Sequence, residues 1–168
     1  MSTQISTTAA TEAAATGHVD YRLEVVVIGV TDADRARDFY ASLGWRLDAD
    51  VSGDNGYRLF QMTPPGSTCS LIFGHMVTSA VPGSGDIYLA VTDIEAARED
   101  LVSRGVDVSA VFHAADGGLG GGFHVDGEEQ TPGPDPEGRS YASYAEFHDP
   151  DGNRWVLQQL TTRLPGRV

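Results

Sequence analysis

The sequence predicts an α+β fold made of two βαβββ modules, which form a cupped mixed sheet with the helices outside. The first observation is an internal repeat: VTDADRARDFYASLGWRL from Val30 returns as VTDIEAAREDLVSRGVDV from Val91, with seven of 18 positions identical at an offset of 61 residues. The second is that short apolar or alternating segments, separated by turn-forming residues, surround each copy. Such repetition indicates two copies of one supersecondary unit.

The first module is expected to begin with the apolar strand Arg22–Val30 and to continue into a helix. Thr31 or Asp32 can cap that helix and Gly44 can end it, because capping oxygens accept the free N–H groups and glycine readily takes a left-handed conformation. The apolar face of the helix consists of Ala33, Ala36, Phe39, Tyr40 and Leu43. Three strands should follow, at 45–51, 57–62 and 69–74, separated by the turn clusters SGDNG and TPPGS.

The second module repeats this order, with a strand at Asp86–Val91, a helix whose apolar face is Ile94, Ala97 and Leu101, and a strand at Val106–Phe112. A glycine- and proline-rich insertion, Ala115–Ser140, then precedes a hairpin of residues 141–148 and 154–159. Because one helix cannot cover both faces of four strands, the two modules should pack as one unit around a shared concave face.

The hairpin turn lies within FHDPDGNRW, residues 147–155, which is rich enough in oxygen donors to be tested as a calcium loop. Counting from Asp149 places Arg154 at the glycine position of an EF-hand and Leu160 at the position of its bidentate glutamate. The spacing therefore excludes this calcium motif. A proline followed by Asp and Gly is instead typical of a tight turn.

The chain is expected to contain one domain. Residues 1–19 are expected to be a disordered leader, 20–162 one domain with modules at 20–80 and 84–160, and 163–168 a tail.

Composition limits the function classes. The net charge of −13 argues against a nucleic acid partner, and no apolar run approaches the roughly 18 residues of a membrane span. Cys69 is the only cysteine, which fits a reducing cytoplasm and a small buried apolar side chain.

With the repeat in place, the chain resembles the vicinal oxygen chelate superfamily, the fold of glyoxalases, bleomycin resistance proteins and extradiol dioxygenases. The segments that carry the resemblance are VTDADRARDFYASLGW, VTDIEAAREDLVSRGV and FHDPDGNRWVLQ, and the resemblance extends from about Tyr21 to Gln159. It implies a homodimer and a small-molecule ligand or substrate. It does not imply one reaction, because this fold hosts many.

The resemblance also implies where a metal would be held. Metal-dependent relatives place ligands on the first and fourth strand of each module, at positions that correspond here to Val25, Ile72, Asp86 and Val156. Three of these side chains have no donor atom, so we expect no metal and no other cofactor. A metal held by the unusual set His113, Glu146 and His148 is the alternative, although Glu146 and His148 could equally lie on an outer strand face.

The sequence thus leaves three functions open. The leading hypothesis is a metal-independent isomerase, lyase or cyclase, with Asp86 as acid or base, assisted by Tyr88 or His113. The ligand would contact Ser70, Ile72, Val25, Val156, Gln158 and Phe123. The alternatives are a protein that sequesters an antibiotic or metabolite without chemistry, and a metal-dependent lyase or dioxygenase. Asp86 could also be a solvated strand start, and the insertion either a mobile cover or a plain surface excursion.

Overall fold

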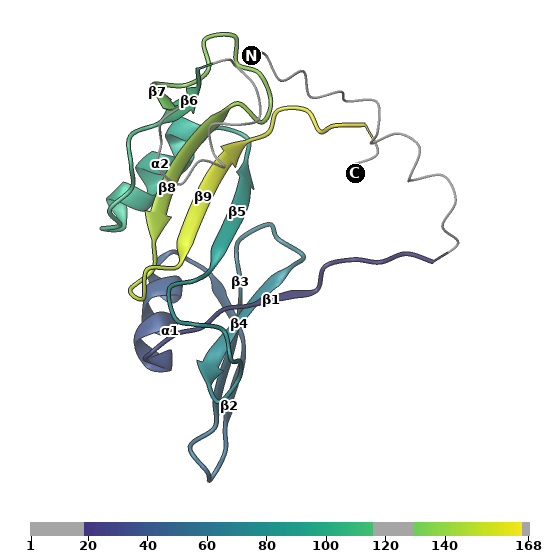
Figure 1. The fold of residues 1–168 in the computed structure, drawn as a ribbon, viewed down its shortest axis with the longest axis vertical. Coiled ribbons are helices and arrows are strands. Elements are labelled where there is room, and N and C mark those ends of the chain that lie inside the picture. The colour runs from purple at the N-terminus through teal and green to yellow at the C-terminus, as the bar shows by residue number, and fades with distance from the viewer. Residues whose placement is uncertain (1–18, 116–129, 166–168) are drawn as a thin grey trace.

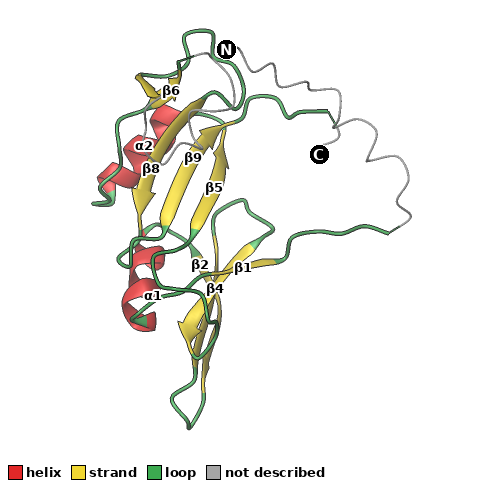
Figure 2. Ribbon diagram, in the orientation of Figure 1, coloured by secondary structure: helices red, strands yellow, loops and turns green. Residues whose placement is uncertain are grey.

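The computed structural model describes residues 19–115 and 130–165 of the chain. Each module contributes a layer of strands with one helix packed on it (Figures 1 and 2). The first module contains β1 (Val25–Val27), α1 (Ala33–Ser42), β2 (Arg46–Ser52), β3 (Arg58–Thr63) and β4 (Ser70–His75). The second contains β5 (Asp86–Val91), α2 (Ile94–Ser103), β6 (Phe112–Ala114), β7 (Gln130–Pro132), β8 (Ser143–His148) and β9 (Arg154–Gln159).

The strand order confirms the predicted α+β fold of two modules. One sheet has the order β1-β4-β3-β2 and the other β5-β9-β8-β6-β7. In both, the first strand pairs in parallel with the last, and the register repeats: Val25 faces Ser70 in one sheet, and Asp86 faces Arg154 in the other. The 61-residue offset of the sequence is therefore preserved in space, since Val25 and Asp86 occupy equivalent positions.

Both helices begin and end as the capping pattern predicts. The side chains of Asp32 and Asp93 each accept a hydrogen bond of 3.0 Å from a backbone N–H three residues later. Gly44 and Gly105 follow the helices with φ of 82° and 86°, the left-handed region that residues with a Cβ disfavour. The predicted apolar faces turn inward: Ala36 and Tyr40 of α1 and Ile94 and Leu101 of α2 are buried.

The larger of two hydrophobic clusters in the described chain extends through both modules. At its centre Tyr40 stacks on Trp45 with ring centroids 4.8 Å apart, and the ring of Trp155 meets Trp45 edge-on at 5.1 Å. Phe73 of the first module and Phe147 of the second extend the same cluster. The aromatic rings therefore join the two modules into one packed unit.

The FHDPDGNRW turn supplies polar contacts between the two modules, beside this aromatic cluster. The carboxylate of Asp149 accepts hydrogen bonds from the Tyr40 hydroxyl (2.8 Å) and Asn153 Nδ2 (2.8 Å), and its other oxygen accepts the backbone N–H groups of Asp151 and Asn153 (2.9 Å each). Asn153 Nδ2 also reaches the carbonyl of Gly29 at 3.0 Å. The oxygens that suggested a metal loop are used to fix the second module to α1.

The second strand of the second module differs from expectation. Residues 106–111 form no strand, and β6 contains only Phe112, His113 and Ala114. Ser109 instead makes two single bonds to β8: its N–H donates to the carbonyl of Glu146 at 2.8 Å, and its hydroxyl accepts from the Glu146 N–H at 2.9 Å. A side-chain hydrogen bond of this kind competes with the regular backbone hydrogen bonds of a sheet.

Within the described ranges, neither helix is long and apolar enough to cross a membrane.

Candidate functional site

Strand alternation divides the side chains of each sheet between the face that packs on the common core and the opposite face, which we call the open face. On the second sheet the open face includes a small buried cluster of Phe112, Tyr144 and Val156. Val26, Leu71, Ile87, Leu89 and Trp155 belong to the core, so their neighbours along each strand point the other way. The predicted site residues on the open face of the first sheet are Val25, Ser70 and Ile72, and those on the second are Asp86, Tyr88, Val156 and Gln158. The structure thus gathers these predicted residues into two groups, one on each sheet.

The family's usual metal positions do not fit a metal here. Val25, Ile72 and Val156 present only hydrocarbon, and a lone carboxylate cannot hold a transition metal against water. Within residues 19–115 and 130–165, no three His, Cys, Asp or Glu side chains gather as metal ligands would. The alternative set is also divided, because His113 pairs with Ser143 on the core face of β8, whereas Glu146 and His148 lie on the open face.

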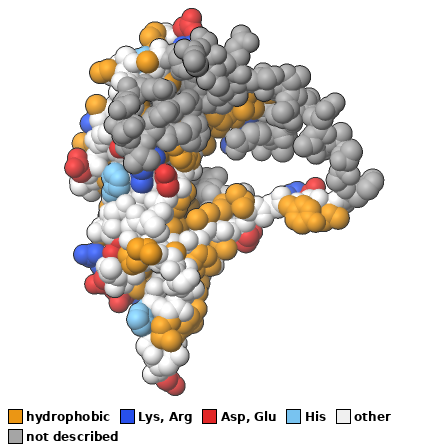
Figure 3. Space-filling view, in the orientation of Figure 1, with side chains coloured by type: hydrophobic (Ala, Val, Ile, Leu, Met, Phe, Trp, Pro, Cys, Tyr) orange, Lys and Arg blue, Asp and Glu red, His pale blue; other side chains and the backbone are white. Residues whose placement is uncertain are grey.

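An arginine between two carboxylates dominates the open face of the second sheet. Arg154 Nη1 lies 3.2 Å from Asp86 Oδ1, and its Nη2 lies 2.8 Å from Glu146 Oε2. Figure 3 shows basic, acidic and histidine side chains side by side over this end of the sheet. Burial alone would lower the pKa of Arg154, but the hydrogen bond to Glu146 and the attraction of both carboxylates raise it.

This ion cluster changes what the predicted catalytic residues can do. The side chain of Asp86 is 50% exposed and already engaged by Arg154, so it is neither desolvated nor free of a cationic partner. Tyr88 lies beside the same arginine; burial raises the pKa of its hydroxyl, and the hydrogen bond with Arg154 opposes that rise. Both side chains therefore belong to one cluster of polar contacts around Arg154.

His113 lies apart from Asp86 and Tyr88. It is on β6, separated from β5 by β9 and β8, which corresponds to about 14 Å across the sheet, and it faces the core side. Its Nδ1 lies 2.7 Å from the carbonyl of Gly133, where it supports the returning end of the insertion. Phe123, the other residue expected from that insertion, lies outside the described residues.

The returning end of the insertion is itself anchored. The side chain of Asp135 is fully buried, and its carboxylate accepts hydrogen bonds from the guanidinium of Arg139 at 2.6 and 3.0 Å and from the Arg139 N–H at 2.9 Å. The hydrogen bonds from Arg139 lower the pKa of Asp135 to about 2. Residues 130–140 are thus a fixed part of the second module.

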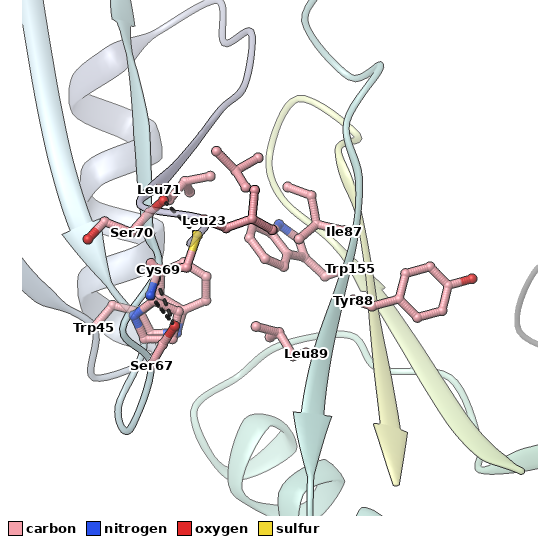
Figure 4. Close-up of a pocket in the computed structure, with 12 residues that line it drawn as sticks. Leu23, Trp45, Ser67, Cys69, Ser70, Leu71, Ile87, Tyr88, Leu89 and Trp155 are labelled. Carbon is pink, nitrogen blue, oxygen red and sulfur yellow. Dashed lines mark hydrogen bonds between the residues drawn. The ribbon is translucent and has the colours of Figure 1, made fainter. Parts of the chain in front are cut away.

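A largely apolar cavity lies between the modules, not on either open face. It has a volume of about 230 Å³ and is lined by Leu23, Val26, Trp45, Pro64, Ser67, Cys69, Ser70, Leu71, Ile87, Tyr88, Leu89 and Trp155. We call it the inter-module crevice. Figure 4 shows Cys69 and Leu71 pointing into it from one side, and Ile87 and Leu89 from the other. The ring of Tyr88 and the hydroxyl of Ser70 point away from it, toward the open faces.

The crevice walls are chemically suited to an aromatic ring. Trp45 and Trp155, the only two tryptophans of the chain, line it together with aliphatic side chains. Its thiol, Cys69, makes only a weak contact of 3.9 Å with a backbone carbonyl. Apolar cavities of about 150 Å³ stay dry and bind benzene-sized molecules, so this volume accepts one or two fused rings.

Of the residues that line the crevice, the sequence predicts only Ser70 and Tyr88 as site residues. Cys69 was expected to be a small buried side chain, but it is half-buried and lies at the cavity. Trp45 comes directly after the glycine that ends α1 and Trp155 directly after Arg154 in the last hairpin, so each is recognisable only as a core residue of its own module. The contact between these two rings depends on how the modules pack against each other, and the periodicity of the strands does not predict that packing.

With this geometry described, the chain can be placed among known proteins. The family model described as Glyoxalase/Bleomycin resistance protein/Dioxygenase superfamily matches residues 22–157. The chain belongs to this superfamily. A search of curated proteins found no match. The superfamily accounts for the repeated modules and for the parallel pairing of first and last strands, but it does not select a ligand or a reaction.

Solved structures of this superfamily resemble the chain over most of its length. A glyoxalase/bleomycin resistance protein from Streptomyces sp. CB03234 is 28% identical, with a TM-score of 0.57, over 82% of this chain and 100% of that chain. TnmS3, an antibiotic binding protein from the same organism, is 27% identical, with a TM-score of 0.60, over 86% and 99%. A superfamily member from Sphaerobacter thermophilus, 24% identical with a TM-score of 0.56 over 83% and 98%, resembles it in fold alone.

Proposed function

We propose that the protein binds a small planar aromatic molecule in the inter-module crevice and sequesters it without chemical conversion. The observation that carries this proposal is the crevice itself: an apolar cavity of about 230 Å³ with both tryptophans in its walls. Aromatic walls favour aromatic guests, because offset or edge-on ring contacts add to the burial of apolar surface. Ser67 and the rim near Tyr88 offer polar groups at the mouth.

An isomerase, lyase or cyclase reaction has less support. Catalysis by an acid or base requires a group whose protonation is shifted toward neutral pH and placed in the pocket. Cys69 is the titratable side chain that points into the crevice, while Asp86 lies on the open face in contact with Arg154. TnmS3, similar to this chain over nearly its whole length, is an antibiotic binding protein, which supports binding over turnover.

The proposal includes a homodimer in the cytoplasm. Family resemblance implies the dimer, and the open face of the first sheet supports it, because Val27 and Val51 expose apolar area there. A reduced, half-buried Cys69 without a partner thiol among the described residues is consistent with a reducing compartment.

Binding can be tested with 1-aminonaphthalene, an uncharged fluorescent two-ring probe that matches the volume of the crevice. Because both tryptophans lie at the crevice, the proposal predicts quenching of their emission by energy transfer and an increase in probe emission, with one probe per chain. Bound probe should also slow the reaction of Cys69 with a thiol reagent. If saturating probe neither quenches tryptophan nor protects the thiol, the proposal fails.

Two substitutions of the same residue provide the control. Cys69→Phe places a ring inside the crevice and should weaken probe binding at least tenfold, whereas Cys69→Ser keeps the volume and should change it less than threefold. Circular dichroism confirms that both variants are folded. Equal affinity of the two variants would show that the probe binds elsewhere.

A further inference from the structure

A second hollow adjoins the inter-module crevice. It has a volume of about 290 Å³ and lies where the turn between β3 and β4 approaches β5 (Figure 1). We call it the polar hollow; its lining consists of residues 64–68, residues 88–90 of β5 and Arg163. Four of these residues, Pro64, Ser67, Tyr88 and Leu89, also line the crevice. The two spaces therefore share a wall, and a substituent of a ligand in the crevice is within reach of the polar hollow.

The polar hollow differs from the crevice in its chemistry. The crevice is lined mainly by tryptophan and aliphatic side chains, whereas Ser67, Thr68 and Arg163 bring hydroxyl and guanidinium groups to the polar hollow. Among the described residues that line either space, Arg163 is the only charged one. It is a cation in a chain of 24 acidic and 11 basic residues. The charge beside the crevice thus has the opposite sign to the net charge of the chain.

The backbone around Arg163 is fixed to the second module. On one side, the Thr162 N–H donates a hydrogen bond to the Ser140 hydroxyl at 3.2 Å. On the other side, the Leu164 N–H donates to the Tyr141 hydroxyl at 3.1 Å. These bonds hold the backbone of Arg163 at the polar hollow, while its exposed side chain can turn toward a ligand.

The opposite wall of the polar hollow is a rigid turn. The Ser67 N–H donates to the carbonyl of Pro64 at 3.1 Å. Pro65 and Gly66 occupy the two central positions, and the φ of Gly66 is 78°, as in a type II turn. The Ser67 hydroxyl donates to the carbonyl of Cys69 at 2.7 Å and accepts its N–H at 3.1 Å. Because this wall is already ordered, binding a ligand group against it costs little conformational entropy.

We propose that the ligand of the crevice is an aromatic carboxylic acid, whose rings occupy the crevice and whose carboxylate is held by Arg163 in the polar hollow. This inference rests on the proposed function and names the chemical class of its ligand. A guanidinium offers parallel N–H donors that match the two oxygens of a carboxylate. A protonated amine at the same position of the ligand would instead be repelled by Arg163.

The test uses two naphthalenes that share their rings and differ in charge. Naphthalene-1-carboxylate and naphthalene-1-carboxamide are titrated separately into protein that carries 1-aminonaphthalene, and displacement of this neutral probe gives the affinity of each. At pH 7 and low salt the carboxylate should bind about fivefold more tightly than the carboxamide, as expected for one exposed ion pair. Added salt should reduce that preference, because it screens exposed charges.

Two variants of the full chain assign the preference to one residue. Arg163→Gln and Arg104→Gln each remove one positive charge, but Arg104 is paired with Asp100 on α2 and lines neither space. Arg163→Gln should abolish most of the preference for the carboxylate, whereas Arg104→Gln should retain it. Circular dichroism confirms that both variants are folded.

Each outcome bears on a different part of the inference. Equal affinities of the two naphthalenes for the unaltered chain, or tighter binding of the carboxamide, would overturn the anion subsite and leave the aromatic crevice in place. A preference for the carboxylate that Arg163→Gln leaves intact would overturn the role of Arg163. If 1-aminonaphthalene itself fails to bind, the proposed function is wrong and the anion subsite falls with it.

Discussion

Replacing Asp149 by Asn should weaken the contact between the two modules and lower the free energy of unfolding, while keeping the shape of the side chain. The carboxylate accepts four hydrogen bonds, two on each oxygen, from the Tyr40 hydroxyl, Asn153 Nδ2 and two backbone N–H groups. An amide has a single acceptor oxygen, and its NH₂ would face two of these donors. At least two hydrogen bonds to a charged group are then lost, each contributing about 1.5–3 kcal/mol.

The expected decrease in the free energy of unfolding is therefore about 4 kcal/mol, which is a large part of the 5–15 kcal/mol typical of a domain. Urea denaturation followed by far-ultraviolet circular dichroism measures it. Asp107→Asn, at an exposed position, is the matched control and should change stability by less than about 0.5 kcal/mol.

The same variant should alter the crevice. Trp155 Nε1 donates to the Tyr40 hydroxyl at 3.0 Å, and that hydroxyl donates to Asp149, so loss of the carboxylate releases a wall residue of the cavity. Burial, together with the neighbouring Asp149 carboxylate, raises the pKa of Tyr40, which keeps its hydroxyl a neutral donor. A shift of tryptophan emission to longer wavelength is expected. A decrease in the free energy of unfolding of less than about 1 kcal/mol would refute the role assigned to the hydrogen bonds of Asp149.

Two other contacts give predictions at defined pH. Because the folded pKa of Asp135 is lowered to about 2, its contribution of about 2 kcal/mol is present above the unfolded pKa near 4 and is lost as pH falls through 2. Asp135→Asn should remove that contribution, so its unfolding free energy should change less than that of the unaltered chain between pH 4 and 2. Arg154→Met leaves the carboxylates of Asp86 and Glu146 without their shared cation and should destabilise by about 1 kcal/mol at pH 7, as measured by urea denaturation. An unchanged free energy of unfolding would contradict this second prediction.

The sequence predicts the fold well because repeated local signals agree with one another. Asp32 and Asp93 cap the helices, Gly44 and Gly105 end them, and the turn after Asp149 forms the last hairpin. Period-two alternation also places the predicted site residues of β1, β4, β5 and β9 on the open faces, namely Val25, Ser70, Ile72, Asp86, Tyr88, Val156 and Gln158. These are properties of neighbours in the chain, which a single sequence contains in full.

The candidate site is less predictable because it depends on contacts between modules. His113 was grouped with Asp86, but the strand there begins only at Phe112, and the register with Ser143 turns His113 to the core side. Arg154 engages Asp86 because the parallel pairing of β5 with β9 sets the two residues opposite each other, and the sequence does not show that pairing. A shift of one residue in the register of a strand moves each side chain to the other face of the sheet. The sequence alone therefore does not decide which side chains reach a site.

The tryptophans of the crevice belong equally to the common core, where Trp155 is 2% and Trp45 7% exposed. A change of either ring to suit a new ligand would also disturb the contact that holds the modules together. Leu23 and Ser67 at the mouth are exposed, and Cys69 is only half-buried, so they can vary at little cost to folding. Selectivity among related aromatic compounds should therefore diversify through the exposed lining residues, while the two buried tryptophans stay unchanged.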